Sequence, residues 1–149
     1  MNRAEQIRKS IEHGWDDVQI KYNIIPDMHI LSIGEIRNAV RSGLTDEQIE
    51  ALLVPGLGDL SLLQVREGLE NGLSVGDVEI YAKPEFDCQQ MRVIREGLEY
   101  GLPKEQVLRY ADPEFLWEEM EVILHCLIKG ITDDEQIEIE LADYWDDEI

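Results

Sequence analysis

The sequence predicts an all-α protein built as an elongated, α-solenoid-like array of five helical hairpins. Three observations predict this fold. The same pattern returns when the chain is shifted by 29 residues, every period carries a glycine, and four of the five carry a proline. The shared apolar position holds Ile7, Ile36, Val65, Ile94 and Ile123; the glycines are Gly14, Gly43, Gly72, Gly101 and Gly130; the prolines are Pro26, Pro55, Pro84 and Pro113. Such internal repeats are typical of stacked helical units.

The first half of each unit is expected to be an amphipathic helix. In the fourth unit Met91, Ile94 and Leu98 are spaced by three and four residues, which places them on one helix face. Gly101 follows closely, where a helix end needs a residue that tolerates positive φ. The other four units repeat this arrangement, so each first helix is expected to end at its glycine.

A second, shorter helix is expected after each glycine. Candidate N-caps are Asp16, Thr45, Ser74 and Thr132, with Gln48 and Glu135 as capping-box partners and Pro103 as a first-turn proline. The apolar anchors of these helices are Ile20, Ile49, Val78, Val107 and, after a one-residue slip, Ile137. The prolines prevent them from continuing. Because such short helices are marginal in water, the units must stack to bury their apolar faces.

The 149 residues are expected to form a single helical-repeat domain. Its units span about 1–26, 27–55, 56–84, 85–113 and 114–149, and the last unit is an acidic cap. One further position in the first helices is always small: Ser10, Ala39, Gly68, Gly97 and Cys126. Glycine costs about 1 kcal/mol against alanine inside a helix, so its use twice predicts that another helix backbone passes close by.

Arginines at one repeat position predict surface ion pairs. Arg8, Arg66 and Arg95 are each followed four residues later by a glutamate, namely Glu12, Glu70 and Glu99. Pairs at this spacing face each other on a helix and contribute a few tenths of a kcal/mol each. This interpretation is preferred to a phosphate-binding stripe.

Net charge excludes direct nucleic-acid binding. The chain carries 33 acidic and 13 basic side chains, for a formal charge of −20, whereas a nucleic-acid surface must be basic. Residues 112–149 carry 14 of the acids against Lys129 alone. The excess therefore lies in the last quarter of the chain, beyond what a solubilising terminal unit needs.

Enzymatic and metal chemistry are not expected. His13, His29 and His125 occupy three different repeat positions, and Cys88 and Cys126 form no metal-binding or disulfide spacing. Neither a cofactor nor a metal is predicted, because the glycines at 56 and 58 follow a helix rather than a strand and the acidic tail lacks a calcium-loop pattern. No apolar leader and no run of 18 apolar residues occurs, so a soluble cytoplasmic protein without membrane contact is expected.

The candidate partner-binding residues lie at the end of the chain. They are Asp133, Asp134, Glu135, Glu138, Glu140, Asp143, Tyr144, Trp145, Asp146, Asp147 and Glu148. The carboxylates would steer a basic partner toward this end, and the two aromatic residues are of the type that anchors interfaces. The alternative is a frayed acidic tail whose aromatic side chains fold back onto the fifth unit.

The fourth unit also carries a resemblance. The stretch 90–102, QMRVIREGLEYGL, together with 110–115, YADPEF, resembles short helical repeats in proteins of mobile elements and phages of Firmicutes. Small acidic proteins of such elements are similar in character to anti-CRISPR and anti-restriction inhibitors, which occupy the nucleic-acid groove of a host defence nuclease. The resemblance assigns no functional residue.

These observations favour a non-enzymatic acidic protein that occupies a basic nucleic-acid-binding groove of a partner, such as a nuclease of host defence. The alternative is a helical-repeat scaffold that binds a protein or peptide without mimicking nucleic acid. Salt dependence separates the two, because only the first loses affinity steeply as ionic strength rises.

Overall fold

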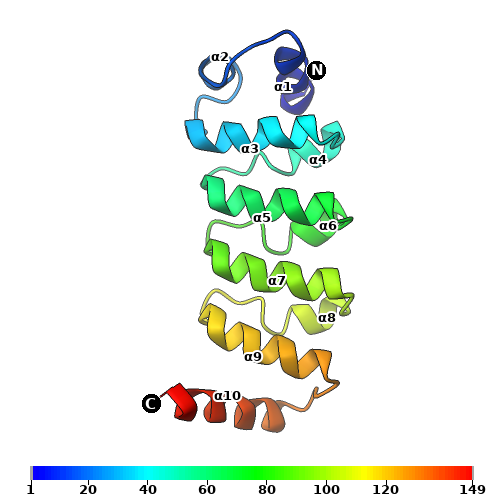
Figure 1. The fold of residues 1–149 in the computed structure, drawn as a ribbon, viewed down its shortest axis with the longest axis vertical. Coiled ribbons are helices and arrows are strands. Elements are labelled where there is room, and N and C mark those ends of the chain that lie inside the picture. Colours follow the sequence, from blue (N-terminus) through cyan, green and yellow to red (C-terminus); the bar gives the residue numbers. More distant parts are fainter. Residues whose placement is uncertain (1, 149) are drawn as a thin grey trace.

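Ten α-helices and no strands make up residues 2–148, the part of the chain that the computed structural model describes, with side chains described for residues 2–146 (Figure 1). The helices are α1 (Arg3–Glu12), α2 (Asp17–Asn23), α3 (Ile30–Arg41), α4 (Asp46–Glu50), α5 (Asp59–Glu70), α6 (Val75–Val78), α7 (Cys88–Tyr100), α8 (Lys104–Val107), α9 (Trp117–Ile128) and α10 (Asp134–Glu148). The predicted all-α class is confirmed. Within these residues, no helix combines the length and the apolar composition that a membrane crossing requires.

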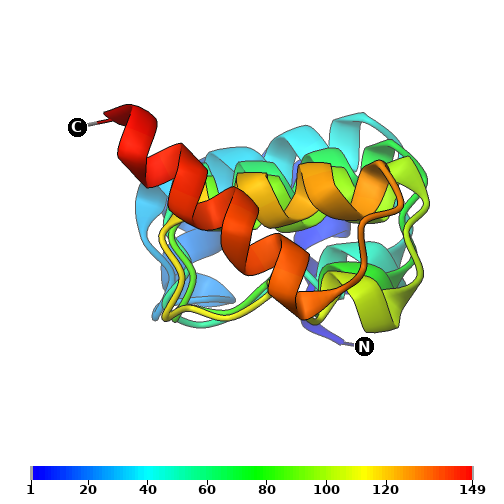
Figure 2. The ribbon, with the colours of Figure 1, turned by 90° about the horizontal axis from the view of Figure 1, so that it is seen from below.

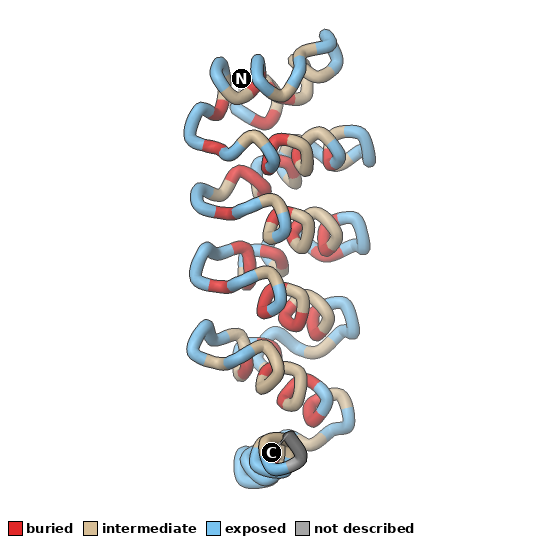
Figure 3. The backbone as a smooth tube through the Cα atoms, turned by 60° about the vertical axis from the view of Figure 1, so that its left-hand side comes forward, coloured by how far each residue is buried: buried red, intermediate tan, exposed pale blue. Residues whose placement is uncertain are grey.

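The long helices α3, α5, α7 and α9 form one layer, in which each packs on the next. The short helices α4, α6 and α8 lie in a second layer along one side of this stack (Figure 2). Buried residues follow the inside of the stack (Figure 3), and all five members of the shared isoleucine or valine position are buried there. Three successive hairpins, α3/α4, α5/α6 and α7/α8, therefore repeat one arrangement.

The turns between long and short helices follow the predicted capping pattern. The glycine after each first helix has a φ between 85° and 101°, a conformation that side chains other than glycine rarely adopt. Asp16, Thr45 and Ser74 cap the next helix, each by accepting a backbone N–H three residues on. Pro103, predicted in the first turn, is instead the N-cap residue of α8, which begins at Lys104.

The glycines inside α5 and α7 make room for tyrosine side chains. A Cβ atom at Gly68 would collide with the hydroxyl of Tyr81, and one at Gly97 with the hydroxyl of Tyr110. The Tyr81 hydroxyl donates to Gln64 O at 2.9 Å, and the Tyr110 hydroxyl donates to Val93 O at 3.2 Å. The prediction of a passing helix backbone is therefore wrong, since the close neighbours are side chains from the second half of the same hairpin.

The first hairpin packs with its two helices in exchanged positions. α1 packs on the short helix α4, and α2 packs on the long helix α3. Arg8 Nε donates to Asp46 Oδ1 at 2.8 Å, and this hydrogen bond holds the pKa of Asp46 below its usual range. The backbone N–H of Ala4 donates to Glu50 Oε2 at 3.2 Å. The first unit shares the sequence pattern of the others but not their packing.

This exchange changes how a loop is supported. In the fourth hairpin Gln90 Nε2 donates to the carbonyls of Pro113 and Phe115 in the following loop, at 3.2 and 2.7 Å. The corresponding carbonyls of the first loop, on Pro26 and Met28, accept instead from Lys21 Nζ, at 2.8 and 2.7 Å. The side chain of Arg3, which occupies the repeat position of Gln90, is thereby left at the edge of a cavity.

Candidate protein-interaction site

The acidic end of the chain is an ordered helix. The carboxylate of Asp133 accepts the backbone N–H of Gln136 at 3.2 Å, and Ile137 N donates to Asp133 O at 3.0 Å. α10 therefore begins one residue later than expected, and the predicted cap at Thr132 with Glu135 as partner is wrong. The helix continues to Glu148 because the fifth unit has no proline at the position where the others do.

The inner side of α10 rests on α9. Ile137 is the buried anchor that the sequence predicted, and Leu141, Tyr144 and Trp145 are half-buried. The rings of Tyr144 and Trp145 meet edge to face, with centroids 5.2 Å apart and an interplanar angle of 75°. Tyr144 also lines a cavity with Cys126 of α9. Both aromatic side chains are thus partly covered, and only part of each ring can reach a partner.

Most of the predicted carboxylates are exposed, on the outer side of α10 and along its edges, where Asp134, Glu138 and Asp143 line cavities. Asp133, Asp134, Glu135, Glu138, Asp143 and Asp146 are exposed, and Glu140 is half-buried and accepts from Gln136 Nε2 at 3.2 Å. The side chains of Asp147 and Glu148 lie outside the described residues. The described part of α10 contains no basic residue, and Asp134 forms its ion pair with Arg109 from the loop between α8 and α9. The charge of this surface is therefore largely uncompensated.

Cavities flank α10 on both sides. One of about 270 Å³ lies against α9 and is lined by His125, Lys129 and Glu140 among others. Another of about 230 Å³ is lined by Arg109, Phe115 and Leu141 among others. α10 packs on α9 and otherwise has only slight contact with the stack. The acidic helix accordingly packs on one neighbour, whereas α5 and α7 in the middle of the stack each pack on a long helix at both sides.

In the middle of the stack, arginines form ion pairs with carboxylates and so offset part of their negative charge. Arginines on successive long helices reach a carboxylate of the preceding helix, with N–O distances of 2.8 Å for Arg37–Asp17, 2.8 Å for Arg66–Glu35 and 3.3 Å for Arg95–Glu67. The predicted pairs within helices are also present, at 3.2 Å for Arg8–Glu12, 2.9 Å for Arg66–Glu70 and 2.8 Å for Arg95–Glu99. These ion pairs form an arginine ladder that joins neighbouring units.

A second arginine position extends the ladder to α9. Arg92 pairs with Glu96 at 2.8 Å and with Glu121 of α9 at 3.1 Å. Its guanidinium also lies over the ring of Trp117, 5.5 Å from the centroid, in a cation–π arrangement. Residue spacing predicts the ion pairs within helices. The ion pairs between units depend on which helices lie side by side, which spacing alone does not give.

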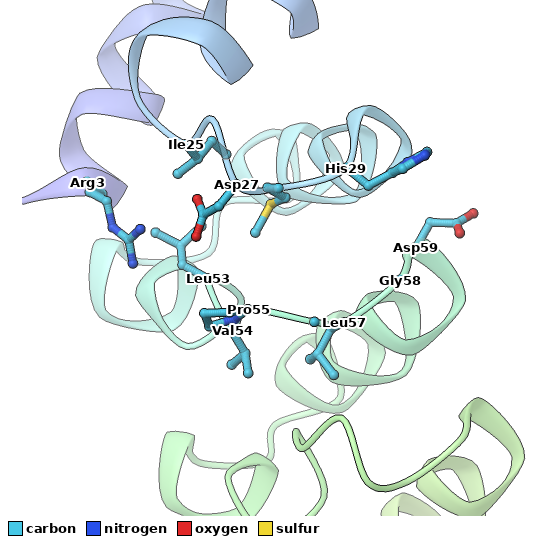
Figure 4. Close-up of a pocket in the computed structure, with 12 residues that line it drawn as sticks. Arg3, Ile25, Asp27, His29, Leu53, Val54, Pro55, Leu57, Gly58 and Asp59 are labelled. Atoms are coloured by element: carbon cyan, nitrogen blue, oxygen red, sulfur yellow. The ribbon is translucent and has the colours of Figure 1, made fainter.

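A further cavity lies near the other end of the stack, where α1 and the loops before α3 and α5 meet (Figure 4). It has a volume of about 360 Å³ and a mostly apolar lining of Ile25, Met28, Leu53, Val54, Pro55 and Leu57. Arg3 and Asp27 point toward one another across it without forming an ion pair. His29 and Asp59 lie at the far side (Figure 4).

The sequence contains a signal for this cavity. The second loop reads Pro55-Gly-Leu-Gly, whereas the next two read Pro84-Glu-Phe-Asp and Pro113-Glu-Phe-Leu. The second loop therefore lacks two side chains and a phenyl ring that the later loops possess. A gap in the repeat at this point could have been inferred from these three differences.

Groups that could carry out chemistry do not converge in the described residues. His13, His29 and His125 are exposed on separate elements, and the imidazole of His29 accepts the backbone N–H of Leu31 at 3.1 Å as the cap of α3. Cys126 is buried, which raises the pKa of its thiol, and neither it nor Cys88 forms a disulfide. No group of three or more potential metal ligands occurs within the described part of the chain.

Comparison of the chain with protein-family models, with curated proteins and with solved structures finds no match. Two surface features of the chain bear on function: the acidic surface of α10 and the cavity beside Arg3.

Proposed function

We propose that the protein is a non-enzymatic, cytoplasmic interaction protein that occupies a basic nucleic-acid-binding groove of a partner protein. The observation that carries this proposal is the acidic surface of α10, where five predicted carboxylates of the helix and that of Asp133, which caps its N-terminus, are exposed. Five of the 13 basic side chains, Arg8, Arg37, Arg66, Arg92 and Arg95, are engaged in the arginine ladder. A partner site that normally binds phosphates would meet the negative charge of the α10 carboxylates at this end of the stack.

The shape of the molecule supports the same proposal. We infer that the stack is an α-solenoid-like array of five hairpins, whose first hairpin is rearranged and whose last has a long second helix. Arrays of this kind present extended surfaces whose units contact only their neighbours. Because α10 forms one end of the array (Figure 1), a groove in a partner can close around it without meeting the rest of the stack.

The charge of α10 is complementary to that of nucleic-acid-binding sites. Such sites are lined with Lys and Arg, and their affinity for an anion falls as salt screens the charges. A helix that carries carboxylates at successive turns offers a row of negative charges on a rigid support. We therefore propose a nucleic-acid mimic, in the manner of anti-CRISPR and anti-restriction inhibitors, with a nuclease of host defence as the partner class. The protein itself binds no nucleic acid in this proposal.

A displacement experiment tests the proposal. Fluorescein-labelled duplex DNA is bound to each member of a panel of restriction and CRISPR nucleases without divalent metal, and the protein is titrated in while anisotropy is followed. We expect the protein to displace DNA from at least one nuclease, with an apparent affinity that falls steeply between low and physiological salt. Displacement from none of them, or displacement that is independent of salt, contradicts the proposal.

Two variants of equal charge locate the effect. The α10 variant replaces Glu135 and Glu138 with Gln and Asp143 and Asp146 with Asn. The control variant replaces four exposed acids of the short helices and loops, Glu47, Glu79, Glu85 and Glu105, with Gln. We expect the α10 variant to displace DNA several-fold less well and the control variant to behave like the parent. Equal losses in both would show that only net charge matters.

A scaffold without nucleic-acid mimicry is the second candidate. Exposed apolar side chains favour it, since Leu31 and Leu60 occupy the same position in neighbouring units and are 60% and 59% exposed. A partner bound through such residues would be held by apolar burial, which salt does not screen. Binding that survives high salt and the α10 substitutions would favour this function over the first.

A further inference from the structure

The cavity beside Arg3 has the features of a binding site for one apolar side chain. Six of the residues that line it are apolar, and its volume of about 360 Å³ lies at the small end of the range for ligand sites. A site of this size and lining suits a single large side chain with its own stretch of backbone rather than an extended cofactor.

The repeat itself shows what such a space accommodates. The loop position of Leu57 is occupied by Phe86 and Phe115 in the next two hairpins, and Phe86 is buried in the core. Gly56 and Gly58 stand where those hairpins have Glu85 and Asp87, or Glu114 and Leu116. The second loop thus lacks an aromatic ring that the next two loops supply from their own sequence.

Exposed leucines lie close to the same cavity. Leu31 and Leu60 follow the lining residues His29 and Asp59 along the chain by two residues and one residue, and more than half of each side chain is exposed. At the same position the next two units have Gln89 and Glu118. Apolar exposure at this repeat position is therefore confined to the two units that form the cavity, as expected for a binding surface with an apolar rim.

Charged groups at the border indicate the polarity of the occupant. Asp27 and Asp59 lie at opposite sides of the cavity. The carboxylate of Asp27 faces the guanidinium of Arg3, whereas that of Asp59 is directed away from the cavity (Figure 4). Since Arg3 and Asp27 form no ion pair with each other, both remain available to a polar group placed between them. A basic side chain can pair with a carboxylate, and a peptide carbonyl can accept from Arg3.

We propose that this cavity binds a peptide segment of a partner protein in which a large aromatic residue is followed by a basic residue. The aromatic ring enters the apolar cavity, and the basic side chain pairs with Asp27. The net charge of −20 favours the same kind of partner. The site does not depend on α10, because no residue of that helix takes part.

Titration of short peptides into the folded protein tests this site. The probe is acetyl-Gly-Phe-Arg-Gly-amide, and the reporter is the methyl resonance of Met28, with the fully buried Met91 and Met120 as internal references. We expect a saturable shift of Met28 alone. Replacing Phe by Ala in the peptide should weaken binding by about ten-fold or more, because the buried apolar area is lost. Replacing Arg by Glu should weaken it several-fold.

A substitution in the protein provides the matched test. Gly58→Leu adds at this position the side chain that Leu116 has two units later, and its φ of −78° suits any residue. A Cβ atom there meets nothing within 4 Å, so the variant should fold while it narrows the cavity. Gly34→Leu, at another position with open space around the Cβ, is the control. Binding should be lost in the first variant and unchanged in the second.

Three results would overturn the proposal: no saturable shift of Met28 at millimolar peptide, equal binding of the Phe and Ala peptides, or undiminished binding to a folded Gly58→Leu variant. If that variant fails to fold, the comparison of peptides on the parent protein decides the question alone.

Discussion

The middle hairpins and the C-terminal helix handle charge and packing in opposite ways. In the middle, arginines such as Arg66 bind carboxylates of their own helix and of the preceding one, and the long helices pack on neighbours at both sides. At the end, α10 rests on α9, is flanked by two cavities and carries exposed carboxylates. The first region pairs many of its charges within the stack, whereas the second leaves most of its carboxylates exposed to solvent.

The units of one repeat array can therefore differ in their surface composition and packing. Each middle helix must satisfy two neighbours, which constrains its apolar face and its ion pairs. A terminal helix has one neighbour, so its outer side can take any composition that remains soluble. In this chain that freedom is used for acidic residues, and the position of the free surface follows from the architecture.

The largest expected difference between the two regions is in core truncation. Ile94→Ala in α7 should lower the free energy of unfolding by about 3 kcal/mol, because the fully buried side chain leaves a cavity between tightly packed helices. Ile137→Ala in α10 should lower it by about 1 kcal/mol, because cavities already flank that helix and it can open locally. Urea denaturation measures both values.

Hydrogen exchange distinguishes local opening from global unfolding. In Ile137→Ala the amides of α10 should lose protection while those of α7 keep it. Comparable losses of global stability in the two variants would mean that α10 is as firmly integrated as the middle helices.

The next effect concerns the tyrosine that fills the space above Gly97. Gly97→Ala should cost about 2 kcal/mol, since its Cβ would collide with the hydroxyl of Tyr110. In a Tyr110→Leu background the same change should cost nothing or stabilise by up to about 1 kcal/mol, because alanine has the better helix propensity. The hairpin α3/α4 already carries this combination as Ala39 and Leu52, both buried.

Urea denaturation of the four proteins of this double-mutant cycle measures the coupling. If Gly97→Ala costs the same with tyrosine and with leucine at position 110, the glycine is not there to admit the ring.

Much of the fold was predictable because the repeated residues reflect local conformational preferences. Spacings of three and four place Ile94 on a buried face, and a glycine such as Gly101 must end a helix wherever the chain needs positive φ. The exchanged packing of α1 and α2 was not predictable, since shared spacing does not say which neighbour a face meets. The neighbour of Gly97 was predicted wrongly, because a small residue indicates that another group lies close but not which group it is.

The candidate site was predictable to a similar degree. Acidic composition placed exposed carboxylates at the end of the chain, and Glu135 and Glu138 are indeed exposed. Composition did not indicate that Tyr144 would be partly covered beside α9, which depends on how α10 is oriented. The cavity near Arg3 depends on both the glycines of the second loop and the displacement of α1, and only the glycines are visible in the sequence.

Alkaline pH should weaken the middle of the stack. Burial raises the pKa of Tyr81 and of Tyr110 above the usual value of about 10. Their neutral forms therefore contribute stability that is complete below pH 10 and is lost as pH rises above it, by up to about 1.4 kcal/mol per tyrosine for each pH unit. Urea midpoints measured between pH 9 and 11 should fall less in a Tyr81→Phe, Tyr110→Phe variant. An equal fall in both proteins would assign the effect to other groups.

The smallest expected effects come from single ion pairs, and here too the two regions should differ. Arg66 Nε is 2.8 Å from Glu35, and the two side chains are only 17% and 19% exposed, so their pairing is poorly screened by water. Arg66→Gln should therefore cost about 1 kcal/mol. Asp134 pairs with Arg109 but is 92% exposed and lies among other carboxylates, so the attraction of one arginine is offset by repulsion along α10. Asp134→Asn should change the free energy of unfolding by less than about 0.5 kcal/mol, and raising the salt concentration should remove what remains. Thermal or urea unfolding at low and high salt measures both variants. A loss in Asp134→Asn as large as that in Arg66→Gln would contradict this expectation and show that the ion pair helps to hold α10 on the stack.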